Sequence, residues 1–158
     1  MIHDKTIRVG ACDWQHPQWQ NSFYPDDLPQ DWRLSYYANE FSTVLVPQSQ
    51  WQASWQAEGA DFEQWAEDVP EGFRFYFLTA DLDVDDSPIK KQLGEAFAGF
   101  VPAHGNAEVA LINYAEKNLR GWKQWLLEVD FRVVFLMGED VSVAQLAEFQ
   151  SLVEVMGL

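Results

Sequence analysis

The sequence has little cysteine and few basic residues, and each shortage excludes a class of protein. Cys12 is the single cysteine among 158 residues, so we expect neither an internal disulfide framework nor a cysteine-rich zinc site. Lys and Arg number 10 against 25 Asp and Glu, which gives a net charge of −15. Proteins that bind phosphate backbones need clustered Lys and Arg. We therefore expect no nucleic-acid partner, and the acidity also disfavours an anionic membrane surface.

Several motifs are missing as well. No run of about eighteen apolar residues predicts a membrane span, and the first residues lack a secretory signal pattern, so we expect a cytoplasmic protein. The glycine-rich nucleotide fingerprints, the nucleophile elbow and the HExxH metal motif are absent. The acidic stretch Asp81–Asp86 fails the calcium-loop pattern, because Asp86 and Gln92 stand where Gly and Glu are required. The sequence thus predicts no metal site and no cofactor.

What the chain does have is apolar and aromatic material in a regular order. Hydrophobic residues make up 47% and aromatic residues 15%, with 8 Trp, which is enough to bury the core of one domain over residues 1–158. Short β-rich runs alternate with amphipathic stretches. We expect helices that start at the N-caps Asp31, Asp61 and Ser142, two more helices at 89–100 and 119–127, and strands at 7–12, 43–46, 73–78, 108–114 and 131–137.

This alternation predicts an α/β fold with about five parallel strands covered by helices. A closed barrel of eight strand–helix units usually needs about 200 residues or more. The chain is shorter than that. We therefore expect an incomplete or reduced barrel.

The first half of the chain carries a series of motifs whose combined spacing is specific. In order they are Val9-Gly10-Ala11-Cys12-Asp13-Trp14, Trp19, Phe23-Tyr24-Pro25, Leu28, Trp32, Tyr36-Tyr37-Ala38, Phe41, Thr43-Val44, Phe62, Trp65, Pro70 and Gly72-Phe73-Arg74-Phe75. This series resembles the YecE-like family, domain of unknown function 72. The resemblance implies a TIM-barrel-like fold. It implies no reaction, because that family has no established biochemical activity.

The chain departs from that family's pattern at polar positions near the ends of strands. The family's Glu-Ile-Asn on the second strand falls on Leu45-Val46-Pro47, its lysine on the third strand falls on Leu78, and its Ser-Gly after the first strand falls on Cys12-Asp13. In parallel barrels the chemistry sits at the carboxyl ends of the strands. The resemblance therefore implies a shortened and divergent member whose pocket has been dismantled or rebuilt.

Two residues after the first strand are candidates for catalysis. Asp13 and His16 would form an acid/base or ligand pair, and the alternative is an ordinary loop in which Trp14 packs downward. Cys12 would need a base and an electropositive setting to act as a nucleophile. Its acidic surroundings favour a buried, unreactive side chain instead.

Trp and Gln residues are candidates for binding. Trp14, Trp19, Gln48 and Trp51 belong to this group, because Trp and Gln side chains suit stacking on and hydrogen bonding to a sugar or a base, and Trp is also enriched in protein interfaces. The alternative for residues 48–56 is an amphipathic helix with Trp51 and Trp55 packed inward.

Two functions from different classes follow from these observations. The first is a non-catalytic binding or structural module that forms a homodimer or docks on another protein, since an incomplete barrel leaves open strand edges. The alternative is an enzyme that acts on a small polar substrate such as a sugar, with Asp13, His16 and Gln48 at the strand ends.

Overall fold

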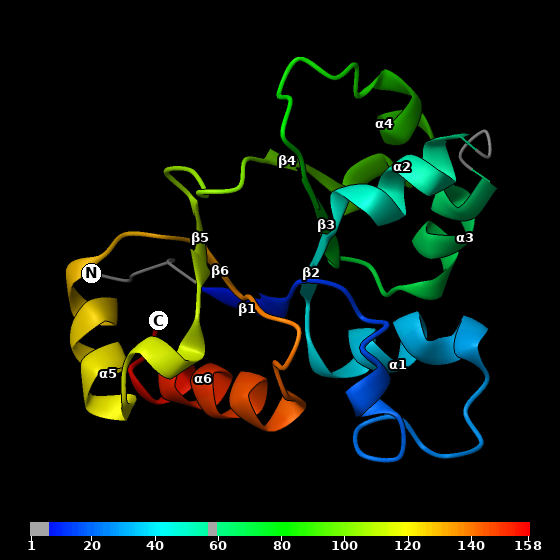
Figure 1. The fold of residues 1–158 in the computed structure, drawn as a ribbon. Coiled ribbons are helices and arrows are strands. Elements are labelled where there is room, and N and C mark those ends of the chain that lie inside the picture. Colours follow the sequence, from blue (N-terminus) through cyan, green and yellow to red (C-terminus); the bar gives the residue numbers. More distant parts are fainter. Residues whose placement is uncertain (1–6, 57–59) are drawn as a thin grey trace.

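Parallel strands form the centre of the molecule. The computed structural model describes residues 7–56 and 60–158 (Figure 1). Two three-stranded sheets are present in this part of the chain, with the orders β1-β6-β5 and β2-β3-β4, and every pair of neighbours is parallel. The strands are β1 (Arg8–Ala11), β2 (Thr43–Val46), β3 (Arg74–Leu78), β4 (Phe97–Val101), β5 (Val109–Ile112) and β6 (Val133–Leu136). The predicted α/β class is confirmed.

Helices cover the outer faces of these strands. In Figure 1, α5 and α6 lie beside β1, β5 and β6, and α2, α3 and α4 lie beside β2, β3 and β4. The α-helices are α1 (Arg33–Glu40), α2 (Gln48–Gln56), α3 (Ala60–Asp68), α4 (Ser87–Leu93), α5 (Leu119–Glu128) and α6 (Val143–Val155); four short 3-10 helices are η1 (Pro17–Trp19), η2 (Gln30–Trp32), η3 (Gly94–Ala96) and η4 (Tyr114–Glu116). None of the helices described is long and apolar enough to cross a membrane.

The two sheets meet where β1 lies against β2. A single bridge pairs Cys12 with Leu45, and the N–H of Asp13 donates to the carbonyl oxygen of Leu45 at 2.8 Å. The backbones approach so closely that a Cβ on Gly10 would lie 2.3 Å from the carbonyl oxygen of Thr43. Only glycine fits at this position without moving a strand.

A tyrosine from α1 completes the joint. The Tyr37 hydroxyl accepts a hydrogen bond from the Ala11 N–H at 3.0 Å and donates one to the Thr43 carbonyl oxygen at 2.7 Å. Tyr37 is fully buried, so these backbone groups have no access to water there. One side-chain hydroxyl thus takes the place of a direct hydrogen bond between β1 and β2.

The strands follow chain order around a curve that does not close. Joined through the β1–β2 contact, the sheets give the order β5-β6-β1-β2-β3-β4. Within the described residues no ladder joins β4 to β5, and residues 102–108, which connect them, contain no helix. The expectation of an incomplete barrel agrees with this open sheet.

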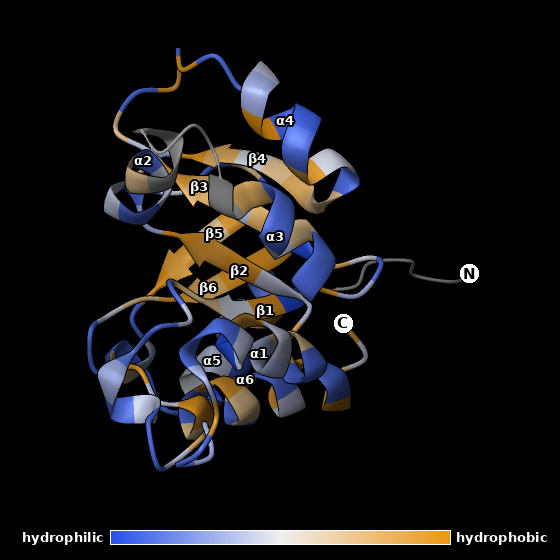
Figure 2. Cartoon of the chain, turned by 90° about the vertical axis from the view of Figure 1, so that its right-hand side faces the viewer, coloured by the Kyte–Doolittle hydropathy of each residue, from blue (hydrophilic) through white to orange (hydrophobic). Residues whose placement is uncertain are grey.

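Apolar side chains fill both faces of the sheet, and the strands in Figure 2 are accordingly mostly orange. The larger cluster lies between the outer face and the helices. The smaller cluster, here called the inner cluster, lies on the concave face, where the rings of Tyr76 on β3 and Phe135 on β6 meet edge to face at 5.6 Å. Its buried members are Leu45, Val101, Val109, Val133 and Phe135, and Cys12, Tyr76, Leu78, Leu111 and Met137 pack against them.

One predicted helix is wrong. Residues 89–100 begin as the helix α4, but that helix ends at Leu93, and residues 97–101 form β4. Gly94 has φ 60° and Gly99 has φ 141°, and neither value fits a right-handed helix. The sheet therefore has six strands in the described chain instead of about five.

The predicted N-caps have different outcomes. Ser142 caps α6 with a full capping box, in which its hydroxyl accepts from the Gln145 N–H, so this prediction is confirmed. Asp31 is not an N-cap, because residues 30–32 form η2 and Trp32 leads directly into α1 without a side-chain cap. Asp61 is not an N-cap either, because α3 already includes Ala60; its side chain lies outside the described residues. The helix expected for residues 48–56 is confirmed as α2.

Candidate functional site

Asp13 closes the turn that follows β1. Its backbone has φ 75°, a left-handed conformation that Asp and Asn tolerate better than most residues. Its Oδ1 accepts hydrogen bonds from the Trp14 N–H at 2.7 Å and the Gln15 N–H at 3.0 Å. The carboxylate of this candidate catalytic residue is thus used to hold its own loop.

His16 supports the same loop from the other side. Its imidazole is 8% exposed and lies 4.5 Å from the Trp19 ring. Nε2 lies 2.7 Å from the Cys12 carbonyl oxygen, which can only accept, so Nε2 carries the proton. Nδ1 then accepts from the Gln18 side chain at 3.5 Å. Asp13 and His16 share no hydrogen bond in the described structure, and each is bonded within the loop.

Cys12 points into the inner cluster and is not an activated nucleophile. Burial, and secondarily the neighbouring Asp13 carboxylate, raises the pKa of its thiol to about 12. A reactive cysteine needs the opposite shift, because the thiolate is the nucleophile. By its exposed surface the side chain is only partly buried, but the raised pKa agrees with the expectation that it is unreactive.

Two of the Trp candidates are buried by packing. Trp19 is buried and donates its indole N–H to the Val141 carbonyl oxygen at 2.9 Å. Trp51 is buried and donates to the Leu78 carbonyl oxygen at 2.7 Å. These bonds join distant segments of the chain. The Trp55 side chain lies outside the described residues.

Gln48, the remaining candidate of α2, lies at the carboxyl edge of the sheet. Its Oε1 accepts a hydrogen bond from the Ala80 N–H at 3.0 Å and so fixes the loop that follows β3. The structure therefore brings Gln48, Asp13 and His16 to loops at the same edge of the sheet and gives each of them a bond to the backbone.

A second region has the composition of a binding site. The Trp–Gln cleft is a hollow of about 830 Å³ between the loop after β1, η2 and the start of α1 on one side, and α2 and α3 on the other. Trp14, a sequence candidate, forms its floor with Trp65, whose ring lies edge to face at 5.0 Å. Its lining residues are Trp14, Gln15, Gln30, Asp31, Trp32, Leu34, Gln50, Ala53, Gln64, Trp65 and Asp68.

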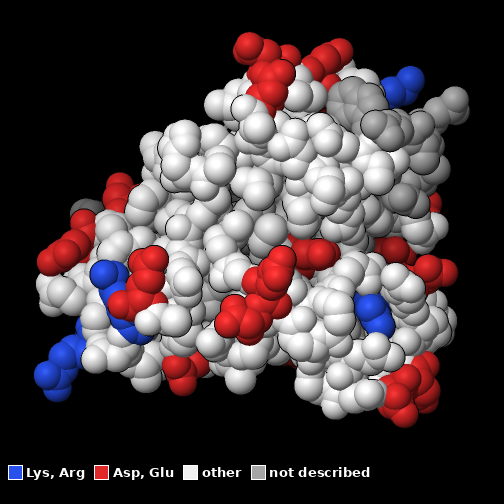
Figure 3. Space-filling model, viewed as in Figure 1, with Lys and Arg blue, Asp and Glu red and all other residues white. Residues whose placement is uncertain are grey.

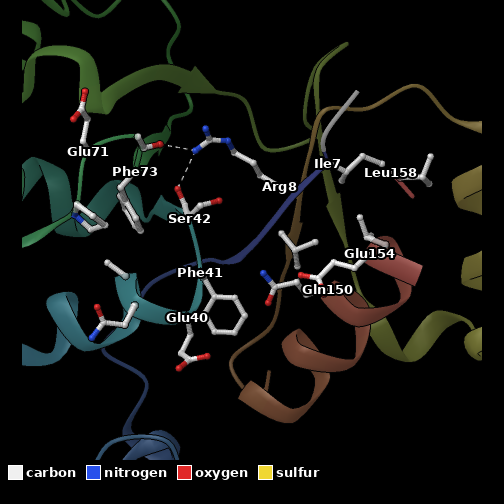
Figure 4. Close-up of a pocket in the computed structure, with 16 residues that line it drawn as sticks. Ile7, Arg8, Glu40, Phe41, Ser42, Glu71, Phe73, Gln150, Glu154 and Leu158 are labelled. Carbon is white, nitrogen blue, oxygen red and sulfur yellow. Dashed lines mark hydrogen bonds between the residues drawn. The ribbon is translucent and has the colours of Figure 1, made fainter. Parts of the chain in front are cut away.

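A hollow at the opposite edge of the sheet is held together by an arginine. It measures about 470 Å³ and lies at the amino ends of β1 and β2 (Figure 4). Arg8 donates to the Ser42 carbonyl oxygen at 3.2 Å and to the Gly72 carbonyl oxygen at 2.7 Å. Glu40, Glu71 and Glu154 also line this hollow. Both acceptors are backbone carbonyl groups, so Arg8 joins β1 to the segments that precede β2 and β3.

The described residues contain no group of three or more His, Cys, Asp or Glu side chains that could hold a metal ion. The acidic loop 81–86 instead bonds to itself. Asp81 Oδ1 accepts from the Asp83 N–H, and Asp85 Oδ1 accepts from the Ser87 N–H, which lowers the pKa of Asp85. On the face shown in Figure 3, acidic side chains clearly outnumber basic ones.

These features define an α/β protein with an open, curved parallel sheet, an apolar concave face and an aromatic, amide-rich cleft outside it. Residues 8–81 match the family DUF72, "protein of unknown function". This match confirms the resemblance over the part of the chain in which the sequence motifs lie.

One solved structure and the curated proteins complete the comparison. The crystal structure of a DUF72 family protein from Enterococcus faecalis V583 is similar with a TM-score of 0.48 and 12% identity, over 99% of this chain and 100% of that chain. No curated protein matches.

Proposed function

We propose that this protein is a non-catalytic binding module built on a reduced TIM-barrel-like fold. The observation that carries the proposal is the inner cluster. Cys12, Leu45 and Leu78 stand where the family pattern has polar residues, and all three contribute to the apolar concave face. A face packed with apolar side chains offers a substrate no polar groups, whereas the Trp–Gln cleft outside it does.

The hydrogen bonds of the carboxyl edge support the same proposal. General acid–base catalysis needs a titratable side chain within reach of the substrate. Asp13 and His16 are instead bonded to loop backbone, and the Cys12 thiol holds its proton. These residues stabilise the loop that forms one wall of the cleft, so their role in binding is indirect.

The experiment compares binding with turnover. The protein is incubated with a panel of small polar metabolites; thermal shifts detect ligands, and proton NMR detects chemical change. We expect at least one ligand that raises the melting temperature and stays unchanged. Asp13→Asn keeps a carbonyl oxygen for the two N–H groups and tolerates a positive φ, so this variant should fold and bind like the natural protein. Turnover that Asp13→Asn or His16→Gln abolishes would overturn the proposal and support the enzyme alternative.

A second copy of the chain is the protein partner that the open sheet favours. The N–H and carbonyl groups of Val109 on the free edge of β5 are already bonded to Asn106, at 2.8 and 3.0 Å, so the start of that edge is covered. The free edge of β4 has no such cover in the described residues, and an uncovered edge invites strand pairing. We expect a dimer in light scattering at high concentration; a strict monomer would contradict this. A cytoplasmic location is part of the proposal and is tested by imaging a fluorescent fusion.

A further inference from the structure

We propose that the Trp–Gln cleft binds a neutral saccharide, with a sugar ring stacked on Trp32. This inference rests on the proposed function and names its ligand class. It differs from the enzyme alternative in position, because the cleft lies between α1, α2 and α3 and outside the sheet. In Figure 1 these helices lie together on the side of the molecule away from α5 and α6.

The cleft has a firm floor and a closed end. Trp14 and Leu34 are buried beneath it, and Trp65 is nearly so. At the end of the cleft formed by Asp68, the Ser35 hydroxyl donates to the Asp68 carbonyl oxygen at 2.8 Å. This bond joins α1 to α3. The two walls are therefore fixed relative to each other, and a ligand meets a preformed site, as small-molecule sites usually are.

Trp32 provides the stacking surface. Trp32 is 63% exposed, whereas most other Trp residues that the structure describes are buried. Keeping a Trp ring in water is unfavourable, since burial of such a ring is a large source of stability. Its position in the short 3-10 helix η2 presents the indole ring at the mouth of the cleft, where the apolar face of a sugar ring would cover it.

Amide and carboxylate side chains supply the hydrogen bonds that sugar hydroxyls need. Gln30, Asp31 and Gln64 are exposed along the walls. An amide both donates and accepts, and a hydroxyl does the same, so the two groups match in any orientation. The Gln50 Oε1 atom is shielded from water and has no hydrogen-bond partner in the described part of the chain. A buried acceptor without a partner is costly, so the Gln50 amide would gain a hydrogen bond by turning towards a ligand hydroxyl.

The charges of the cleft select a neutral ligand. Among the described residues, Asp31 and Asp68 are the ionisable side chains that line it, and no Lys or Arg does so. Arg33, the nearest cation along the chain, donates to Gln15 Oε1 at 3.3 Å and lies 5.4 Å above the centre of the Tyr24 ring. A phosphate or carboxylate on the ligand would meet like charge, so sugar phosphates and sugar acids are disfavoured.

The test is titration calorimetry with a panel of neutral di- and trisaccharides. We expect one of them to bind, Trp32→Ala to weaken it at least tenfold, and Gln50→Leu to weaken it measurably. Leu127→Ala is the matched control, because Leu127 is 64% exposed on α5, away from the cleft, and it should bind as the natural protein does. Circular dichroism checks that each variant folds.

Three results would overturn the inference: no saccharide binds, Trp32→Ala binds as well as the natural protein, or choline competes for the site better than a sugar. The last would point to a cationic ligand on the same aromatic and acidic surface. Proton NMR of the bound saccharide separates this inference from the proposed function. A saccharide that binds and is chemically altered refutes only the non-catalytic role, whereas a different, unaltered ligand refutes only the saccharide.

Discussion

Tyr37→Phe tests whether one hydroxyl holds the two sheets together. The substitution keeps the aromatic ring in its buried site and removes only the oxygen between the Ala11 N–H and the Thr43 carbonyl group. Both backbone groups would then be buried without that partner. Each such loss costs about 1–3 kcal/mol, and the two share one partner, so we expect about 2–4 kcal/mol of destabilisation.

The assay is urea unfolding at equilibrium, supported by thermal melting. For a chain of this size each kcal/mol lowers the melting temperature by about 2–4 °C, so the expected drop is about 5–15 °C. Tyr36→Phe, at the next position of α1, is the control and should change the free energy of unfolding by less than about 0.5 kcal/mol, because Tyr36 is only half-buried. The reasoning fails if Tyr37→Phe is as stable as that control.

Two further predictions concern the inner cluster. Leu45→Ala should destabilise the protein by about 2–5 kcal/mol in urea unfolding, because Leu45 is fully buried. The control Leu127→Ala, on the surface, should have little effect on the free energy of unfolding. Equal effects of the two substitutions would mean that the concave face is not a packed core. Cys12 should react more slowly with a thiol reagent at pH 8 in the folded protein than in urea, because its raised pKa keeps the thiol protonated, and equally fast labelling in both states would contradict this. Because folding raises its pKa from 9.0 to about 12, the stabilisation from its neutral thiol is full below about pH 9 and is lost as the pH rises towards 12; Cys12→Ala should reduce that loss in alkaline unfolding.

The central strands could be predicted because their sequence allows few alternatives. Val133–Leu136 is a continuous apolar run and is buried on both faces, as the pattern of a parallel strand indicates. The strand β4 could not be predicted in the same way, because Ile89, Leu93 and Phe97 also fit helical spacing. The first two are indeed buried in α4, and the glycines that end the helix carry no periodic signal. The competing interpretations differ only in backbone conformation, which hydrophobic periodicity does not report.

The cleft was largely hidden from the sequence for a different reason. Trp14 is a sequence candidate, but the expected N-cap at Asp31 places Trp32 in the first turn of a helix. The chain forms η2 first, so Trp32 precedes α1 and faces solvent. The other lining residues come from α2 and α3, which follow β2, and only folding brings them to the loop after β1. Sequence spacing alone does not connect such segments.

Stability and recognition depend on separate residues in this fold. The inner cluster and the Tyr37 joint bury side chains that a ligand cannot reach, while Trp32, Gln30 and Gln64 are exposed and hold few internal contacts. Substitutions at exposed positions usually change stability by less than about 0.5 kcal/mol. Variants at these exposed positions should therefore lose a ligand without loss of stability, whereas variants at Trp14 or Trp65 on the cleft floor should lose both. Variants of the inner cluster should lose stability before any change in the cleft. A protein whose site lay among the strands would couple the two effects, because its binding groups would belong to the core.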